Sequence, residues 1–180
     1  MNETIQTLKT RRSSRNFTDK PVERELIEQI VDAGLWAPSG MGKQAPIILA
    51  VTDKELRDRL SRMNADVMRA AGRGGDGDFD PFYGGPVVLV VLADKSVPTY
   101  VYDGSLVMGN LMNAAASLGV GSIWIHRAKE EFESEEGRKI LADLGVEGEF
   151  EGIGHCVLGY PETPAGEGAP RKDGRVFWAE

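Results

Sequence analysis

Hydrophobic and polar positions along the chain follow two different periods, and each period predicts a different kind of element. Apolar residues spaced three and four apart predict amphipathic helices, whereas short continuous apolar runs rich in β-branched residues predict buried strands. The helical pattern covers residues 4–11, 22–36, 54–68, 102–119 and 133–145. The strand pattern covers residues 46–52, 86–94, 120–125 and 152–161.

Proline and glycine mark several of these boundaries. Pro21 precedes the second helix, Pro38 follows it, and Gly145 closes the last one. These are the positions where the two residues are favoured at helix ends. The 102–119 segment has few charges and is apolar nearly all round, so we expect it to be a central, buried helix.

The alternation of helices and strands predicts an α+β fold of the layered α/β kind, as a single domain over residues 1–180. We expect helices packed on a sheet of four or five strands, and the pattern leaves the strand directions open. The tail after residue 161 is rich in proline and glycine and ends in the strand-like RVFW. Because Phe177 and Trp178 have little reason to stay in solvent, we expect this tail to add to a sheet edge, of its own chain or of a partner.

Composition narrows the classes of function. The chain has 180 residues and a net charge of −7, which argues against non-specific nucleic-acid binding and requires any anion site to be local. A single cysteine, Cys156, excludes an intrachain disulfide and favours a reducing compartment. The N-terminus lacks the apolar core of a signal peptide, and no apolar run has the length of a membrane span. The expectation is therefore a cytoplasmic protein.

The stretch TRRSSRNF (10–17) places three arginines and two serines at the end of the first helix. One interpretation is a solvated helix end, where cations complement the helix dipole. The other is an anion site, in which guanidinium groups and hydroxyls converge on a phosphate. A second basic pair, Arg171 and Lys172, could meet the first cluster over one phosphate.

Other candidate motifs carry less weight. Gly72, Gly74 and Gly77 satisfy a dinucleotide fingerprint by letter, but a predicted helix precedes them and acidic residues follow, so a surface loop is the better interpretation. His155 and Cys156 are neighbours on a predicted strand, so their side chains should point to opposite faces. Neither a Ser–His–Asp triad nor a metal site can be assembled, and this scarcity of acid–base groups suits a reaction carried by a cofactor.

Four motifs in register resemble the FMN-dependent nitroreductase family, of which this chain would be a compact member. They are RRSSRNF, APSGMGKQAP, FYGGPVVLVV with DGSLVMGNLMNAAASLGVGSIWI, and IGHCVLGYPE with PRKDGRVFW, and together they span residues 11 to about 178. The resemblance implies a central mixed sheet and a homodimer, with FMN at the subunit interface and an extended C-terminal strand that reaches the partner subunit.

The resemblance also implies which residues hold the cofactor, with no catalytic side chain and no metal. Its phosphate and ribityl chain would be held by Arg11, Arg12, Ser13 and Arg15, with Arg171 and Lys172 completing the phosphate site. The other subunit would pack Pro38, Ser39, Gly40 and Gln44 against the isoalloxazine. The ring would be lined by Trp124, Ile125, His126 and Arg127, with Asn64 on its pyrimidine side.

The chain also departs from the family pattern. Gly42 stands in place of an asparagine, Ala45–Pro46 in place of Pro-Trp, and His126–Arg127 in place of a glycine or an acidic residue. We expect the cations near the ring to favour anionic substrates or to stabilise reduced flavin. The short connection between Asp94 and Asp103 implies an open pocket, or one roofed by residues 72–82.

The resemblance implies an NAD(P)H oxidoreductase that reduces nitroaromatics, quinones or enones by ping-pong hydride transfer. Two alternatives remain open at this point. One is a specialised flavin enzyme on the same scaffold, such as a dehalogenase or an oxidase. The other is a flavin-binding or sensor protein without turnover.

Overall fold

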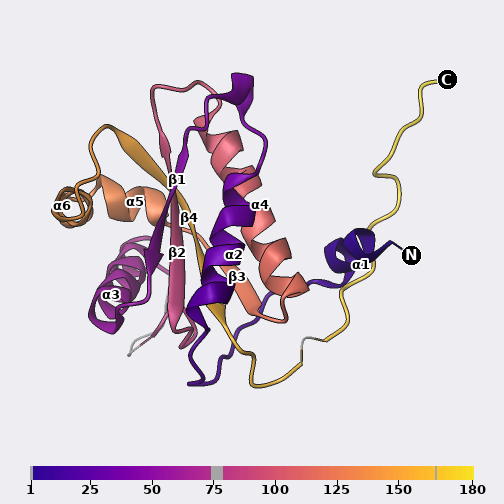
Figure 1. Ribbon diagram of the computed structural model, residues 1–180, viewed down its shortest axis with the longest axis horizontal. Coiled ribbons are helices and arrows are strands. Elements are labelled where there is room, and N and C mark those ends of the chain that lie inside the picture. The colour runs from indigo at the N-terminus through magenta and orange to yellow at the C-terminus, as the bar shows by residue number, and fades with distance from the viewer. Residues whose placement is uncertain (1, 74–78, 165) are drawn as a thin grey trace.

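The structure, a computed structural model, describes residues 2–73, 79–164 and 166–180, and its elements follow the predicted alternation (Figure 1). Its helices are α1 (Glu3–Thr10), α2 (Arg24–Leu35), the 3₁₀ turn η1 (Gly40–Gly42), α3 (Lys54–Ala70), α4 (Tyr100–Ser117), α5 (Ala128–Glu133) and α6 (Glu135–Asp143). Its strands are β1 (Pro46–Val51), β2 (Val87–Asp94), β3 (Gly121–Ile125) and β4 (Phe150–Gly159).

The four strands form one sheet in the order β1-β2-β4-β3, and every neighbouring pair is antiparallel. An isolated parallel bridge between Ser13 and Ser122 adds to the β3 side. The register of β2 against β4 shifts between Val91 and Leu92, which leaves Ile153 as an extra residue in β4. The layered α+β class is confirmed, and four strands is the lower of the two expected numbers. Among the described residues the sheet is antiparallel rather than mixed, because its parallel pairing is confined to the Ser13–Ser122 bridge.

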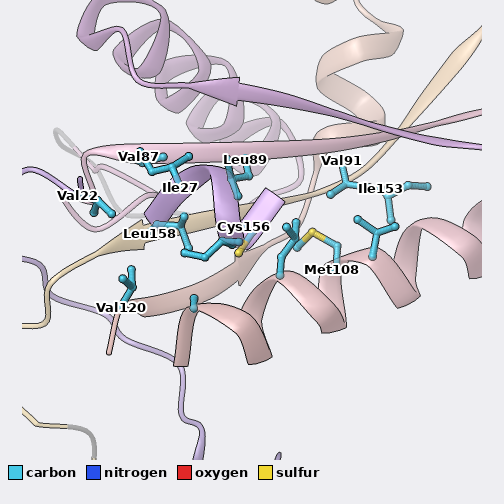
Figure 2. Close-up of a cluster of buried hydrophobic side chains, with 14 of the residues drawn as sticks. Val22, Ile27, Val87, Leu89, Val91, Met108, Val120, Ile153, Cys156 and Leu158 are labelled. Atoms are coloured by element: carbon cyan, nitrogen blue, oxygen red, sulfur yellow. The ribbon is translucent and has the colours of Figure 1, made fainter. Parts of the chain in front are cut away.

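The two faces of the sheet are covered by different helices. Helices α2 and α4 cover one face, and α3, α5 and α6 lie on the other (Figure 1). Because both faces are covered, β2 is apolar along almost its whole length and sends alternate residues into two cores. Val87, Leu89 and Val91 join the core under α2 and α4, which Figure 2 shows around Met108 and Cys156.

The neighbours His155 and Cys156 separate as the strand period requires. Cys156 belongs to the core beneath α2 and α4. His155 is fully buried on the opposite face, where its ring lies 5.1 Å from that of Phe82. The prediction that the two side chains do not form a pair is confirmed.

We expect Cys156 to be unreactive in the folded protein. Burial raises the pKa of its thiol to about 12, although the charge of Arg11 opposes this effect, and the thiolate is the reactive form. A chromogenic disulfide reagent should label no thiol in native buffer and one per chain in denaturant. Rapid native labelling would contradict the burial of this residue.

Three parts of the chain differ from the sequence expectation. Helix α4 is buried on one side only, because the sheet covers one face and leaves Val101, Tyr102 and Leu106 exposed. Helix α5 was not predicted, since six residues are too few to establish a helical period. The tail forms no strand within residues 166–180, and Phe177 and Trp178 are 89% and 83% exposed. Its pairing with a partner's sheet stays a prediction.

Two further predictions were a surface loop at the glycines after α3 and the lack of a segment long enough to span a membrane. Gly72 has a φ of +68° just beyond α3, whereas Gly74 and Gly77 lie outside the described residues. Among the helices described, none combines the length and apolar character needed to cross a membrane.

Candidate functional site

Strand β3 provides the frame of the candidate site because it lies at the edge of the sheet. It pairs with β4 on one side. On the other side the chain before Phe17 touches it at Ser122, whose carbonyl accepts a hydrogen bond from the Ser14 amide at 3.0 Å. In the described part of the chain, no strand pairs with the outer edge of β3 beyond that point. Edge-strand amides and carbonyls of this kind can bind a ligand.

A basic cluster lies beside the start of this strand. Helix α1 ends at Thr10, and the next two side chains, Arg11 and Arg12, are half-buried. Arg12 Nη1 donates to the carbonyls of Lys9 and Arg11, at 3.0 and 2.6 Å. The buried Arg11 Nη1 and Arg12 Nε, however, meet no acceptor within the described residues.

A buried guanidinium N–H without an acceptor costs about 1–3 kcal/mol, which a bound anion would recover. The geometry of Arg11 and Arg12 therefore favours an anion site over a solvated helix end.

The remaining residues of the two basic clusters are more exposed. Ser13 forms the bridge to Ser122, and the Arg15 side chain is exposed. The C-terminal tail passes close to α1 (Figure 1), where a Cβ at Gly168 would collide with the Arg12 guanidinium. Arg171 and Lys172 follow in this tail and are exposed. The tail thus contacts the N-terminal cluster just before its own basic pair.

A cavity of about 230 Å³ opens at the far end of β3. Five of the predicted site residues line it together: Asn64, Trp124, Ile125, His126 and Arg127. The rest of its wall comes from the end of α3 and the chain before β2, namely Met68, Arg73, Phe79, Pro81 and Tyr83. The wall is mainly apolar and aromatic with a few cationic groups, which suits a flat, electron-poor or anionic ligand.

The turn at Arg127 brings positive charge to the rim of this cavity. Its φ of +86° is unusual for a residue other than glycine. Arg127 is the N-cap residue of α5, which begins at Ala128. Arg127 Nη1 forms an ion pair with Glu130 Oε1 at 3.1 Å. Burial raises the pKa of Glu130, but hydrogen bonds from its own backbone and from Arg127, with the charges of Arg127 and His126, lower the pKa overall.

Asp80 holds the turn that carries Phe79, Pro81 and Tyr83 in the wall of this cavity. Its carboxylate accepts hydrogen bonds from Arg57 Nη2 at 2.5 Å, from Ser61 Oγ at 2.6 Å, and from the amides of Phe82 and Gly84 at 2.9 and 2.7 Å. These bonds fix the turn that presents Tyr83, whose φ is +53°. The wall is therefore built by charge-assisted bonds rather than by apolar packing alone.

We expect Asp80→Asn to lower the free energy of unfolding by about 1–2 kcal/mol at pH 7, because the buried Arg57 loses one of its two ionised partners and keeps only Asp58. Burial raises the pKa of Asp80, but its hydrogen bonds outweigh that effect and the pKa lies below the usual value. A lowered folded-state pKa means that the stabilisation is present above the unfolded-state pKa of about 3.9 and is lost as pH falls through the folded-state pKa. Urea unfolding at pH 7 and near pH 3 should show the difference shrinking in acid.

The matched control for this experiment is Asp66→Asn. Asp66 pairs with Arg69 on the exposed side of α3, so the change should cost less than about 0.5 kcal/mol. Equal losses from the two variants would contradict the assigned role of Asp80.

The predicted partner loop lies elsewhere in the chain. It lines a separate cavity of about 110 Å³ with Pro38, Ser39 and Gln44. The Gly40 amide donates to Asp103 Oδ1 at 3.0 Å, and Thr99 Oγ1 donates to the other oxygen of that carboxylate at 3.0 Å. Within one chain, this loop and the end of β3 line two different cavities.

Two buried residues that the sequence did not suggest lie behind the β3 cavity. Asn64 donates to the His126 carbonyl at 2.7 Å and to Glu131, and Glu131 contacts His155. All three residues are at most 1% exposed. The only sequence signal for Glu131 is an acidic residue at a buried position of a helix, and α5 is too short for that pattern to be read.

Comparisons with known proteins agree with the fold. A nitroreductase with bound FMN from Bacteroides fragilis has 28% sequence identity and a TM-score of 0.87, with 100% of both chains covered. One with bound FMN from Desulfitobacterium hafniense has 27% identity and a TM-score of 0.86, again with 100% of both chains covered. The FMN reductase [NAD(P)H] of Bacillus subtilis is 30% identical over 145 residues, which cover 68% of this chain and 53% of that protein.

The chain spans 59% and 53% of the length of the first two curated relatives that it matches. The family model described as the Nitroreductase family matches residues 8–160, which include the basic cluster, strand β3 and the cavity at its end. On that match, the chain belongs to the Nitroreductase family.

Proposed function

We propose that this chain is an FMN-dependent oxidoreductase that uses NADH or NADPH to reduce a small electron-poor acceptor, such as a nitroaromatic, a quinone or an enone. The observation that carries the proposal is the pair of buried guanidinium nitrogens on Arg11 and Arg12 that meet no acceptor in the described part of the chain. Family membership and the solved relatives with bound FMN support the same cofactor.

The residues present fit FMN along the length of β3. Arg11 and Arg12 would hold its phosphate beside Ser122, and the cavity at the end of the strand would take its ring. His126 lies four positions after Ser122, which is roughly 13 Å along a strand. That spacing suits a ligand with an anionic tail and a flat head. The chemistry that FMN supplies when bound is reversible hydride transfer, which lets one site serve NAD(P)H and the acceptor in turn.

The chain's own residues act by binding and electrostatics. Trp124 and Tyr83 give the cavity aromatic surface, and Arg127 places a cation at its rim. That charge would favour an anionic acceptor and an anionic, reduced ring. Neither Cys156 nor His155 can donate a proton directly to a ligand in the cavity, because both side chains are fully buried.

We further propose a homodimer whose second subunit completes the site. Support comes from exposed apolar side chains on α1, α2 and α4 and on the tail, including Trp36, Tyr102 and Trp178. A groove of about 550 Å³ between α1, α2 and α4 lies on the same side of the sheet. Burial of such surface would bring the loop at Ser39 and Gly40 to the partner's ring. A protein that sediments as a monomer with FMN bound would overturn the homodimer proposal.

The first experiment is a visible absorption spectrum of the purified protein before and after addition of NADH or NADPH without oxygen. Flavin bands that bleach, and that return when a nitroaromatic or quinone is added, would support the proposal. Bound flavin that neither nucleotide reduces would favour a flavin-binding or sensor protein. No bound flavin, even after incubation with FMN, would overturn the proposal.

A further inference from the structure

A ring of buried hydrogen bonds lies directly behind the cavity at the end of β3. His155 Nδ1 lies 3.4 Å from the Ile125 carbonyl oxygen, and its Nε2 lies 3.1 Å from Glu131 Oε2. The other carboxylate oxygen, Oε1, accepts from Asn64 Nδ2, which also donates to the His126 carbonyl at 2.7 Å. The ring therefore begins and ends on adjacent residues of one short segment, and three elements contribute to it, α3, α5 and β4.

Counting donors fixes where the protons must be. The Ile125 carbonyl only accepts, so its 3.4 Å contact with His155 Nδ1 is a hydrogen bond in the tautomer that carries a hydrogen on Nδ1. Between His155 Nε2 and Glu131 Oε2 a second hydrogen is needed, on one atom or the other. Both hydrogens of the Asn64 amide are used, on Glu131 and on His126. In either arrangement the His155–Glu131 pair is neutral overall, which is the inexpensive state for two groups at most 1% exposed.

The same count leaves one polar atom over. Asn64 Oδ1 is buried and meets no donor within the described residues. The amide cannot be flipped to use it inside the ring, because both of its partners are acceptors. Asn64 is also part of the cavity wall. The ring thus holds the Asn64 side chain in one orientation, with its oxygen buried and without a donor among the described residues.

We propose that Glu131 and His155 are positioning residues that share one proton and, through Asn64, hold the Ile125–Arg127 backbone in the shape that receives the flavin ring. This inference rests on the proposed function for the identity of the ligand. Neither side chain is exposed, so they act through Asn64 and through the two carbonyls rather than by contact.

Packing alone gives no reason for these polar groups. The surrounding core is apolar, with Phe82, Leu60 and Ile123 among its members. Hydrophobic side chains of similar volume are often as stabilising as a buried ionic pair, or more so. The segment that the ring holds is strained, since Arg127 has a φ of +86°, and strained backbone persists only where its surroundings fix it.

The first test examines the ring itself, in the full-length protein and independently of FMN. The chain has two histidines, so ¹⁵N signals from labelled imidazoles are assigned with a His126→Gln variant. We expect His155 Nδ1 to carry a slowly exchanging hydrogen in the wild type and in Glu131→Gln. The glutamine can donate to Nε2 and accept from Asn64, so it keeps the ring closed without the shared proton. An unprotonated Nδ1 in the wild type would overturn the inference.

The second test compares FMN dissociation constants, measured by flavin fluorescence, across conservative and disruptive variants. Glu131→Leu removes both carboxylate oxygens of the ring and should weaken FMN binding about tenfold or more. The magnitude follows the effect of residues that orient metal ligands through hydrogen bonds. Glu131→Gln should stay within about threefold of the wild type. His155→Phe keeps a ring against Phe82 but removes both nitrogens, and it replaces Glu131→Leu if that variant does not fold.

The outcomes separate the two proposals. Wild-type FMN affinity in Glu131→Gln, together with weaker affinity in Glu131→Leu or His155→Phe, supports a positioning role. Equal affinity in all variants, or equal loss in glutamine and leucine, overturns it. A wild-type protein that binds no FMN overturns the proposed function, while the nitrogen signals still decide whether the ring exists.

Discussion

Replacement of Arg11 with alanine is expected to weaken FMN binding about 10- to 100-fold. The lost interaction is a charge-assisted hydrogen bond to phosphate, of about 1.5–3 kcal/mol, and each 1.4 kcal/mol corresponds to about a factor of ten. The buried Arg11 Nη1, which meets no acceptor in the described residues, is the group involved. Fluorescence titration of FMN against the purified variant measures the effect.

The same substitution should not destabilise the protein without FMN. Removal of a buried donor that lacks an acceptor relieves a desolvation cost, so the midpoint of unfolding should be unchanged or higher. Arg24→Ala is the matched control, because Arg24 lies on the solvent-exposed side of α2 in an ion pair with Glu28. We expect the control to leave FMN affinity unchanged. Equal affinity in Arg11→Ala and the wild type would contradict the anion site.

Gly152→Ala is expected to lower the free energy of unfolding by about 3 kcal/mol, the upper end for overpacking. Gly152 lies on β4 where helix α5 begins, and a Cβ there would collide with the backbone carbonyl of Ala128. Backbone cannot turn aside as a flexible side chain does, so α5 must shift. For a domain of this size the midpoint of thermal unfolding should fall by about 6–12 °C.

This shift should also reach the candidate site. Ala128 directly follows Arg127, so displacement of α5 changes the segment that lines the cavity, and FMN affinity should fall together with stability. Gly166→Ala is the control, because a Cβ there meets nothing within 4 Å, and its effect should stay within about 0.5 kcal/mol. A thermal unfolding midpoint for Gly152→Ala equal to that of the wild type would mean that α5 is not held against β4.

The long elements could be predicted from periodicity alone. Helices α2 and α3 each turn an apolar stripe inward, and β2 is apolar throughout because it lies between two layers. The opposite orientations of His155 and Cys156 followed from the two-residue period of a strand. The short helix α5 was not predicted, because six residues complete fewer than two helical turns.

The candidate site was predicted in part. The motifs placed Trp124 to Arg127 and Asn64 near one ligand, and the structure brings these residues into one cavity. The loop at Pro38 to Gln44 does not join them within a single chain, so a second chain is required for the predicted arrangement. A motif in the sequence carries no information on which subunit supplies it.

The sequence by itself determined the layered class, the two apolar faces of the sheet and the presence of a basic cluster, because these depend on residue type and local spacing. Only the tertiary structure decided that Arg11 and Arg12 are buried donors in need of an acceptor, since burial depends on how α1 and the tail pack beside β3. It also closed a ring of Asn64, Glu131 and His155 from three elements distant in sequence. Such contacts arise from the packing of the whole chain, and local periodicity does not encode them.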